Sequence, residues 1–380
     1  MNLYVESIKQ AVDIFPIVMI LFTIPYIAYN YHKYGSIFSL RIIIIYSFLL
    51  YLICIYCLVI LPIPSPEKAA TLHGHKMQLV PFTFVEDIIK KSDIMLREPK
   101  TWLRLINNKA FLVAVFNMFM TFPFGAYLRY YFRYSATKSF VLSFLLSLFF
   151  ELTQLTGLYF IFNGSYRIFD VDDLIQNTFG SMLGFFFVGF FLKVLPSREE
   201  MDKLSFRRGV QVSFLRRLFS FGFDTFFFVI MSFATAFLAR AYDFNPKFWW
   251  GYVLLFVYFG IFPIFFKGST FGMMITSTRI SSVAGQKTFW YQYIIRFLSL
   301  EFIILWFPIQ LNDFLISLAE SGDLTESASI ILHLVIYGTY AIYIFYAMLM
   351  IVLHKQLFYE RLSKTQIVST VDISKIDNEN

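Results

Sequence analysis

The chain has 380 residues, of which 58% are hydrophobic, 21% aromatic and 15% charged, and its formal net charge is +7. This apolar share is far above that of a soluble domain, so the composition excludes an ordinary soluble enzyme and indicates an integral membrane protein. Because the basic residues stand between apolar stretches and not in one patch, the charge indicates membrane topology and anionic lipid headgroups, and we expect no nucleic acid partner.

Nine apolar segments are long enough to cross a bilayer, whose hydrocarbon core takes about 20 helical residues. In chain order they are residues 12–29, 39–63, 111–129, 140–162, 172–193, 215–240, 249–267, 292–312 and 329–353. The sequence therefore predicts an all-α fold, a polytopic transmembrane bundle of about nine spanning helices in two domains.

The polar stretch 196–209 is the predicted boundary between those domains. A five-helix domain (residues 1–195, with a long external loop at 64–110) precedes this cytoplasmic linker, and a four-helix domain (210–370) and a polar tail (371–380) follow it. Residues 81–106 in the external loop mix apolar and charged side chains, which fits either an interfacial helix or a soluble loop.

Basic residues in the short loops predict the orientation, because cytoplasmic loops carry an excess of Lys and Arg. Residues 193–217 are rich in both, whereas the loop 313–328 is acidic and has neither. We therefore expect a multi-pass protein of the bacterial cell membrane, with its N-terminus outside and its C-terminus in the cytoplasm.

Polar side chains gather around the turn at residues 163–167. Glu151 and Gln154 interrupt the apolar segment before the turn, and ionisable groups at membrane depth usually face a bundle interior or a water-filled cavity. After the turn, one helix face repeats polar and small residues at Asp173, Asn177, Gly180 and Gly184. The side chains that we expect to share one pocket are Asn117, Glu151, Gln154, Arg167, Asp170, Asp173 and Asn177.

These residue types suit a phosphate-bearing ligand. An arginine at position 167 offers a bidentate fork to phosphate, and Asn117, Gln154 and Asn177 would hold the substrate by hydrogen bonds. If the pocket is catalytic, Glu151, Asp170 and Asp173 are the candidate acids or bases, and the last two also suit a divalent cation. A purely structural network of buried ion pairs would use the same residues, so the sequence leaves open whether the protein is an enzyme.

No sequence motif indicates a particular cofactor. Cys54 and Cys57 have the spacing C-x-x-C, but they lie in an apolar segment without His or acidic neighbours. We therefore expect them to pack as small apolar side chains, and we predict no metal site there.

The first half resembles the VanZ-like family of bacterial membrane proteins. The residues that carry the resemblance follow the family's order and spacing, and they are Asn117, Phe122-Pro123-Phe124-Gly125, Glu151, Gln154, Arg167, Asp170, Asp173, Asn177, Gly180 and Gly184. The resemblance implies a role in the Gram-positive cell envelope, since the name-giving member is associated with resistance to the glycopeptide teicoplanin.

Arg217 and Asp224 lie on the apolar segment 215–240, and two later stretches, residues 268–280 and 356–368, follow them. The spacing of the first pair and the two later motifs are similar to those of the RDD family, which the second half resembles. Met273, Glu360 and Lys364 stand where the family usually has Lys, Asp and Gly. The resemblance implies a polar network of Arg217, Asp224 and Glu360, and some relatives have been linked to sodium/proton exchange.

The sequence is compatible with three functions. The preferred one is to bind or modify an outer-leaflet lipid headgroup or a lipid-linked cell-wall precursor, with a link to teicoplanin-type resistance. An ion- or proton-coupled transporter that uses the second half is the first alternative, and a non-catalytic membrane scaffold is the second. The expected partners are therefore membrane lipids or lipid-linked precursors, and nothing in the sequence indicates an oligomeric state.

Overall fold

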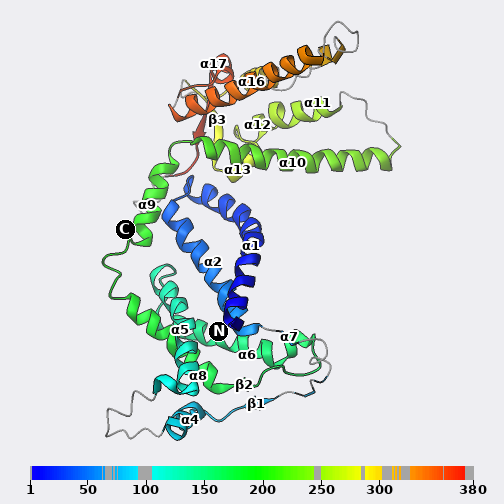
Figure 1. Cartoon of the computed structure of the whole chain (residues 1–380). Helices are drawn as coiled ribbons and strands as arrows, with labels where there is room; N and C mark the ends of the chain where they lie inside the picture. The colour runs from blue at the N-terminus through cyan, green and yellow to red at the C-terminus, as the bar shows by residue number, and fades with distance from the viewer. Residues whose placement is uncertain are drawn as a thin grey trace. The chain divides into compact units, whose positions relative to one another are not determined.

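The computed structural model is almost entirely helical (Figure 1). It describes residues 2–61, 63–64, 71, 73–74, 76–92, 105–243, 250–283, 287–301, 310–311, 313–314, 316–317, 326–353 and 355–372.

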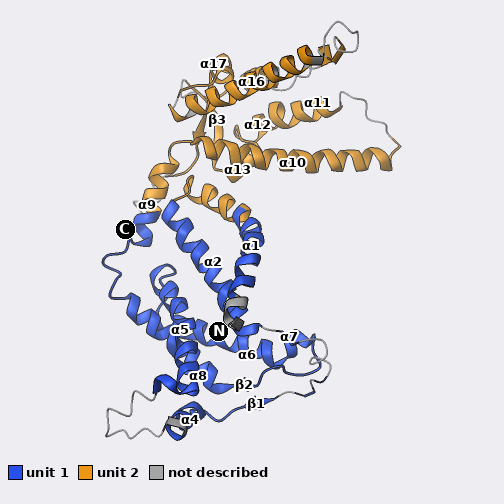
Figure 2. Ribbon diagram, in the orientation of Figure 1, with its two compact units in different colours: residues 1–23, 39–201 blue, residues 24–38, 202–380 orange. Residues whose placement is uncertain are grey.

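The chain forms two compact units, which Figure 2 shows in different colours. Unit 1 comprises residues 1–23 and 39–201, and unit 2 comprises residues 24–38 and 202–380. Helix α1 (Asn2–Tyr34) therefore contributes its first part to unit 1 and its last part to unit 2. Helix α9 (Arg198–Gly209), which occupies the polar stretch between the two sequence resemblances, likewise contributes to both units.

Unit 1 is built on three packed helices, α5 (Lys109–Tyr130), α6 (Ala136–Leu155) and α8 (Val171–Val188). Each begins at a polar cap, because side-chain oxygens of Asn108, Ser135 and Asp170 accept hydrogen bonds from the first free backbone N–H groups. The remaining elements of this unit are α2 (Ser39–Ile60), β1 (Met77–Gln78), α4 (Thr83–Ser92), α7 (Gly157–Phe160) and β2 (Phe169–Asp170).

Glycines set how closely α5 and α8 pack. A Cβ atom at Gly180 or Gly184 would overlap the backbone of α5 at Met118 or Phe122, and one at Gly125 would overlap the Ser181 carbonyl. The small residues on this face of α8 therefore let α5 approach closely.

The fourth predicted apolar segment does not form one continuous helix. Helix α6 ends at Leu155, and Gly157, Leu158, Tyr159 and Phe160 all have positive φ angles between 58° and 69°. They form a left-handed turn, α7, which redirects the chain into the turn at 163–167. Gly157 is required at its start, since a Cβ there would lie 2.6 Å from the Gly164 carbonyl oxygen.

Unit 2 is built around the long helix α10 (Phe214–Ala241). The other elements are α11 (Trp250–Leu255), the π-helical turn η2 (Phe256–Ile261), α12 (Phe262–Phe265), α13 (Phe271–Ile275), β3 (Thr278–Ser282), α14 (Trp290–Glu301), α16 (Glu326–Val352), α17 (Phe358–Ser363) and β4 (Thr365–Ser369). Strands β3 and β4 pair in antiparallel fashion, with Ile280 opposite Ile367. This ribbon joins the two later motifs of the second half.

Six helices of the described part are long and apolar enough to cross a membrane: residues 8–34, 39–60, 109–130, 136–155, 214–241 and 330–350. The prediction of an all-α, multi-pass bundle is confirmed. The other three predicted spans differ in length, since α8 has 18 residues and the helical stretch Trp250–Phe265 is shorter still. The last of the three, residues 292–312, begins as α14, and positions 302–309 lie outside the described residues.

Candidate functional site

Parts of four helices in unit 1 surround a cavity of about 180 Å³. They are the C-terminal ends of α2 and α6, the first half of α5 and the first turns of α8. Six of the seven residues that we expected to share a pocket line this cavity: Asn117, Glu151, Gln154, Arg167, Asp173 and Asn177. Arg167 is exposed, whereas Glu151, Gln154 and Asn177 are buried, so the cavity runs from an exposed arginine to a buried polar floor.

Glu151 is held by the backbone of the next helix. Its side chain is 2% exposed, and its Oε2 accepts a hydrogen bond of 2.9 Å from the backbone N–H of Asp170. Its Oε1 has no partner among the described residues. One carboxylate oxygen is therefore anchored, and the other is available to whatever enters the cavity.

Arg167 is positioned by the end of α2. Its Nη1 donates to the Val59 carbonyl at 2.9 Å and its Nη2 to the Leu61 carbonyl at 3.3 Å. Gln154 also donates to Val59, at 3.0 Å. Such carbonyls at a helix C-terminus lack partners within the helix. Within the described chain Arg167 forms no ion pair, so three of its five N–H donors and its charge are available to a ligand.

Two asparagines complete the floor. Asn117 Nδ2 donates to Asp173 Oδ1 at 2.8 Å and to Gln176 Oε1 at 3.0 Å. Asn177 Nδ2 donates to Ser147 Oγ at 3.0 Å, while its Oδ1 is buried without a partner in the described structure. A buried acceptor that faces no donor carries a cost unless a water or ligand supplies one.

Asp170 has a different position from its neighbours, because it does not line the cavity. It caps α8, and its Oδ1 accepts from the Asp172 backbone N–H at 2.8 Å. Burial raises the pKa of this carboxyl, and the hydrogen bond from Asp172 offsets only part of that effect. Among the described residues, no group of three or more His, Cys, Asp or Glu side chains has the arrangement of a metal site.

Asp172 has a role that the sequence did not reveal. Its carboxylate, 2% exposed, accepts hydrogen bonds from Phe82 N, Thr83 Oγ1 and Phe84 N at 2.5, 2.5 and 2.9 Å. It thereby fixes the start of α4, and β1 pairs with β2 beside it. Its partners lie about 90 positions earlier, so no local pattern could have identified them.

Two protein-family models match the chain, one in each half. Residues 48–193 match the VanZ/LLP1 family model, and residues 211–356 match the RDD family model. The chain joins a VanZ-like region to an RDD region. This confirms the two resemblances read from the sequence. No curated protein and no solved structure matched the chain.

Every residue that lines the polar cavity lies within the VanZ-like region. Among the residues that the structure describes, none from the RDD region lines this cavity.

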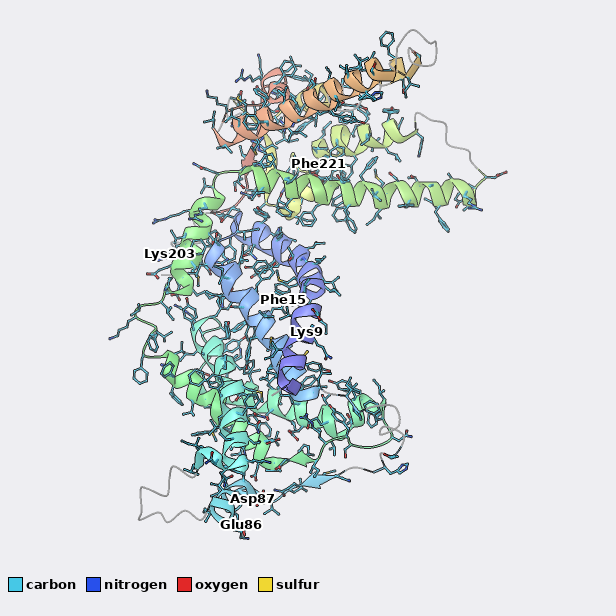
Figure 3. The ribbon with its side chains drawn as sticks, in the orientation of Figure 1. Lys9, Phe15, Glu86, Asp87, Lys203 and Phe221 are labelled. Atoms are coloured by element: carbon cyan, nitrogen blue, oxygen red, sulfur yellow. The ribbon has the colours of Figure 1, made fainter. Side chains whose placement is uncertain are left out.

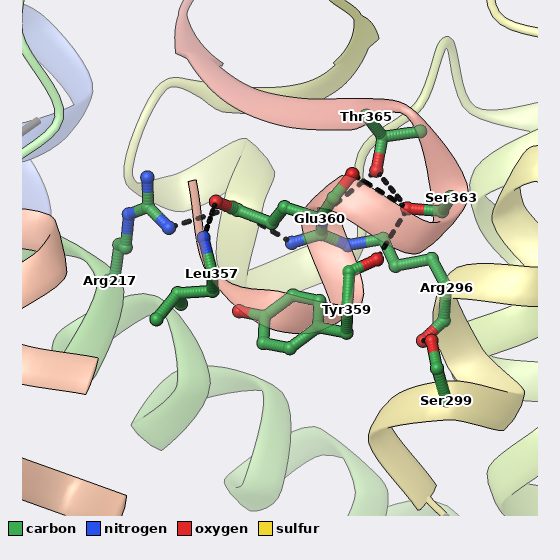
Figure 4. A network of polar contacts seen from close by, with 8 residues as sticks. All are labelled: Arg217, Arg296, Ser299, Leu357, Tyr359, Glu360, Ser363 and Thr365. Carbon is green, nitrogen blue, oxygen red and sulfur yellow. Dashed lines mark hydrogen bonds and ion pairs between the residues drawn. The ribbon is translucent and has the colours of Figure 1, made fainter. Parts of the chain in front are cut away.

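In the RDD region, Arg217 and Glu360 form an ion pair of 2.8 Å (Figure 4). Arg296 Nη2 lies 3.6 Å from the same Glu360 oxygen, and the Leu357 backbone N–H donates to the other oxygen at 3.0 Å. The sequence did not single out Arg296. Its guanidinium group lies over the aromatic ring of Tyr359, and this cation–π contact also helps to position it.

Asp224 has its own partners. It accepts from Tyr258 Oη at 2.8 Å, Thr270 Oγ1 at 2.7 Å and the Gly272 backbone N–H at 2.7 Å. Of the three residues that we expected in one network, the structure thus pairs Arg217 with Glu360 and links Asp224 to the start of α13.

Arg216 is a further buried group that the sequence did not single out. It is fully buried, and it donates to the backbone carbonyls of Gly209, Thr276 and Ser277 at 2.6 to 2.7 Å. It therefore ties the start of α10 to the loop that precedes β3.

Proposed function

We propose that the cavity of the VanZ-like region binds the phosphate-bearing headgroup of an outer-leaflet lipid or a lipid-linked cell-wall precursor. The observation that carries this proposal is the position of Arg167, exposed at the cavity and without an ion-pair partner in the described structure. Guanidinium groups recognise phosphate oxygens through paired N–H donors, and this one is already held in place by α2.

The floor of the cavity adds selectivity for hydrogen-bond donors. Glu151 Oε1 and Asn177 Oδ1 are both acceptors without a described partner. A headgroup that carries an amine or a hydroxyl beside its phosphate would donate hydrogen bonds to these acceptors while its phosphate binds Arg167. A volume of about 180 Å³ fits such a headgroup and excludes a whole glycan.

The cavity walls also suit an amphiphile. Leu58, Val113, Phe116 and Met120 line the cavity beside the polar residues, and they come from the apolar helices α2 and α5. A ligand with a charged head and a hydrocarbon chain can therefore keep its chain against apolar side chains while its head reaches Arg167.

We place the cavity at the outer leaflet. The support is the bias of basic residues in the short loops, which puts the turn at 163–167 outside. Reduced susceptibility to teicoplanin-type antibiotics is a consequence that the resemblance implies for a protein that handles a lipid-linked precursor.

The same residues define what a catalytic version would need. Arg167 would hold the phosphate, Glu151 would act as acid or base, and Asp173 would orient a water molecule or cation. Asp170 would act only by fixing Glu151, because it does not line the cavity.

The geometry gives less support to the two alternatives. A scaffold predicts a pocket filled by internal ion pairs, whereas Arg167 has none in the described chain and the cavity is open. A transporter predicts a carboxylate with free acceptor sites, whereas Asp224 already accepts three hydrogen bonds.

Native mass spectrometry of the purified full chain, with identification of its co-purified lipids, tests the proposal. The variants are Glu151→Gln and Arg167→Gln, and Arg133→Gln is the matched control, because it removes an arginine in the loop at the opposite ends of α5 and α6. We expect a phosphate-bearing lipid class that is enriched in the wild type and in Arg133→Gln and depleted in the other two. The same bulk lipids in all four proteins would contradict the proposal.

A further inference from the structure

Two cavities adjoin each other in unit 2 beside the Arg217–Glu360 pair. The first, which we call the polar cavity, has a volume of about 390 Å³ and a mixed lining whose polar residues include Gln211, Arg217, Lys355, Gln356, Glu360 and Ser369. The second, of about 310 Å³, is mainly apolar and is lined by residues such as Phe214, Leu218, Phe221, Phe297, Leu300 and Ala347. Arg217 and Ile367 line both, so the two cavities share a wall.

The charge of the polar cavity is positive. Glu360 brings one carboxylate, which lies against the guanidinium groups of both Arg217 and Arg296. Lys355 lines the same cavity and is exposed. Arg217 also has a buried Nε–H without a partner in the described structure. The cations thus exceed the single carboxylate, and one of them has a donor to spare.

The apolar cavity begins where a membrane headgroup region would end. Arg217 is in the first turn of α10, which is one of the helices long and apolar enough to span the membrane. Leu218 and Phe221, which follow on the same helix, are 50% and 61% exposed and line the apolar cavity. Phe221 is labelled on this helix in Figure 3. Arginines at the ends of spanning helices lie at the depth of lipid phosphates.

We propose that unit 2 binds one molecule of a monoanionic phospholipid, with its phosphate in the polar cavity against Arg217 and Lys355. One hydrocarbon chain of the lipid lies in the apolar cavity. A molecule in which a charged group and an apolar chain are covalently joined is what two such cavities with a common wall accommodate. Free phosphate would use only the first cavity and would leave the second to bulk lipid.

Lipid titration followed by native mass spectrometry tests this site. The full chain is delipidated in detergent and carries Arg167→Gln, so that the cavity of the VanZ-like region does not contribute to binding. The probes are dioleoyl phosphatidylglycerol, dioleoyl phosphatidylcholine and glycerol 3-phosphate. The variants are Lys355→Gln, Arg217→Gln and Leu218→Trp, and the control is Lys287→Gln, an exposed lysine of the same unit that lines neither cavity.

We expect phosphatidylglycerol to bind at least about fivefold more tightly than phosphatidylcholine. Lys355→Gln should weaken phosphatidylglycerol about fivefold, Leu218→Trp should weaken it by filling the apolar cavity, and Lys287→Gln should leave it unchanged. Lys355→Gln keeps the test valid if Arg217→Gln misfolds, because Lys355 has no described ion pair with Glu360.

Three results would overturn the proposal. Equal binding of the two phospholipids, or equal effects of Lys355→Gln and Lys287→Gln, would show that the polar cavity does not select an anion. Glycerol 3-phosphate that binds as tightly as phosphatidylglycerol would show a free phosphate site without a chain. None of these results depends on whether the VanZ-like region binds a lipid.

Discussion

Four acidic residues of the VanZ-like region have three different environments. Glu151 and Asp173 line the cavity, Asp170 caps α8, and Asp172 holds the segment that leads into α4. The last three stand within four consecutive positions, so their roles follow from the directions in which successive helical residues point. Carboxylates that are clustered in the sequence therefore do not all share one site in the structure.

Asp172 is expected to anchor residues 77–92. Asp172→Ala removes the buried acceptor of three hydrogen bonds at once, and we expect a loss of about 2 kcal/mol in the stability of residues 77–92. Hydrogen exchange or limited proteolysis of that segment measures the loss.

Asp87→Ala is the control for this change. Asp87 is an exposed residue of α4 that Figure 3 shows beside Glu86. If residues 77–92 are as well protected from exchange or proteolysis in Asp172→Ala as in the control, the assignment of Asp172 as their anchor is wrong.

The raised pKa of Asp170 predicts a specific pH dependence. Because its folded-state pKa lies above the ordinary carboxyl value of about 3.9, the folded state binds more protons in the window between the two values. The contribution of Asp170 to the free energy of unfolding therefore falls as pH rises through that window.

Asp170→Asn keeps the helix cap but cannot titrate. We expect the stability of the wild type relative to this variant to fall as pH rises from about 4 toward neutrality. Thermal unfolding in one detergent at several pH values measures the difference. A difference that stays constant or grows with pH would contradict the assignment.

At the scale of elements, the contact of α5 with α8 depends on the absence of side chains. Gly184→Ala places a methyl group against the Phe122 carbonyl, and the helices must separate to accept it. We expect a loss of about 2 kcal/mol in the free energy of unfolding.

Gly222→Ala is the matched control, since a Cβ there meets nothing within 4 Å and Ala favours a helix by about 1 kcal/mol over Gly. Thermal unfolding should therefore move the two variants in opposite directions. If Gly184→Ala instead stabilises the protein, α5 and α8 do not pack as closely at this position as the structure shows.

Helical periodicity was enough to predict much of the cavity of the VanZ-like region. Asp173, Asn177, Gly180 and Gly184 share one helix face, and the structure places the first two at the cavity and the glycines against α5. Periodicity could not predict the break after Leu155, because the residues that follow it remain mostly apolar while their backbone becomes left-handed. Nor could it predict the ribbon of β3 and β4, whose two strands are separated by more than 80 positions.

The basic residues of the short loops predict one orientation of the whole chain in its membrane. The charge bias predicts that residue 163 is external and that residue 137 is cytoplasmic. In a protein without Cys54 and Cys57, a membrane-impermeant maleimide should label Asn163→Cys on intact cells. It should label Thr137→Cys only after permeabilisation. The opposite pattern would invert the proposed topology and place the cavity at the inner leaflet.

The central claim is that the cavity of the VanZ-like region holds a phosphate-bearing lipid headgroup. A photoreactive benzoylphenylalanine in place of Phe116, which lines the cavity, tests it directly. Phe119 of the same helix is the control, because it is 73% exposed and does not line the cavity. We expect Phe116 to crosslink one class of phosphate-bearing lipid, and Arg167→Gln to abolish this crosslink, while Phe119 crosslinks lipids in proportion to their abundance. The same lipid profile at both positions, unchanged by Arg167→Gln, would contradict the claim.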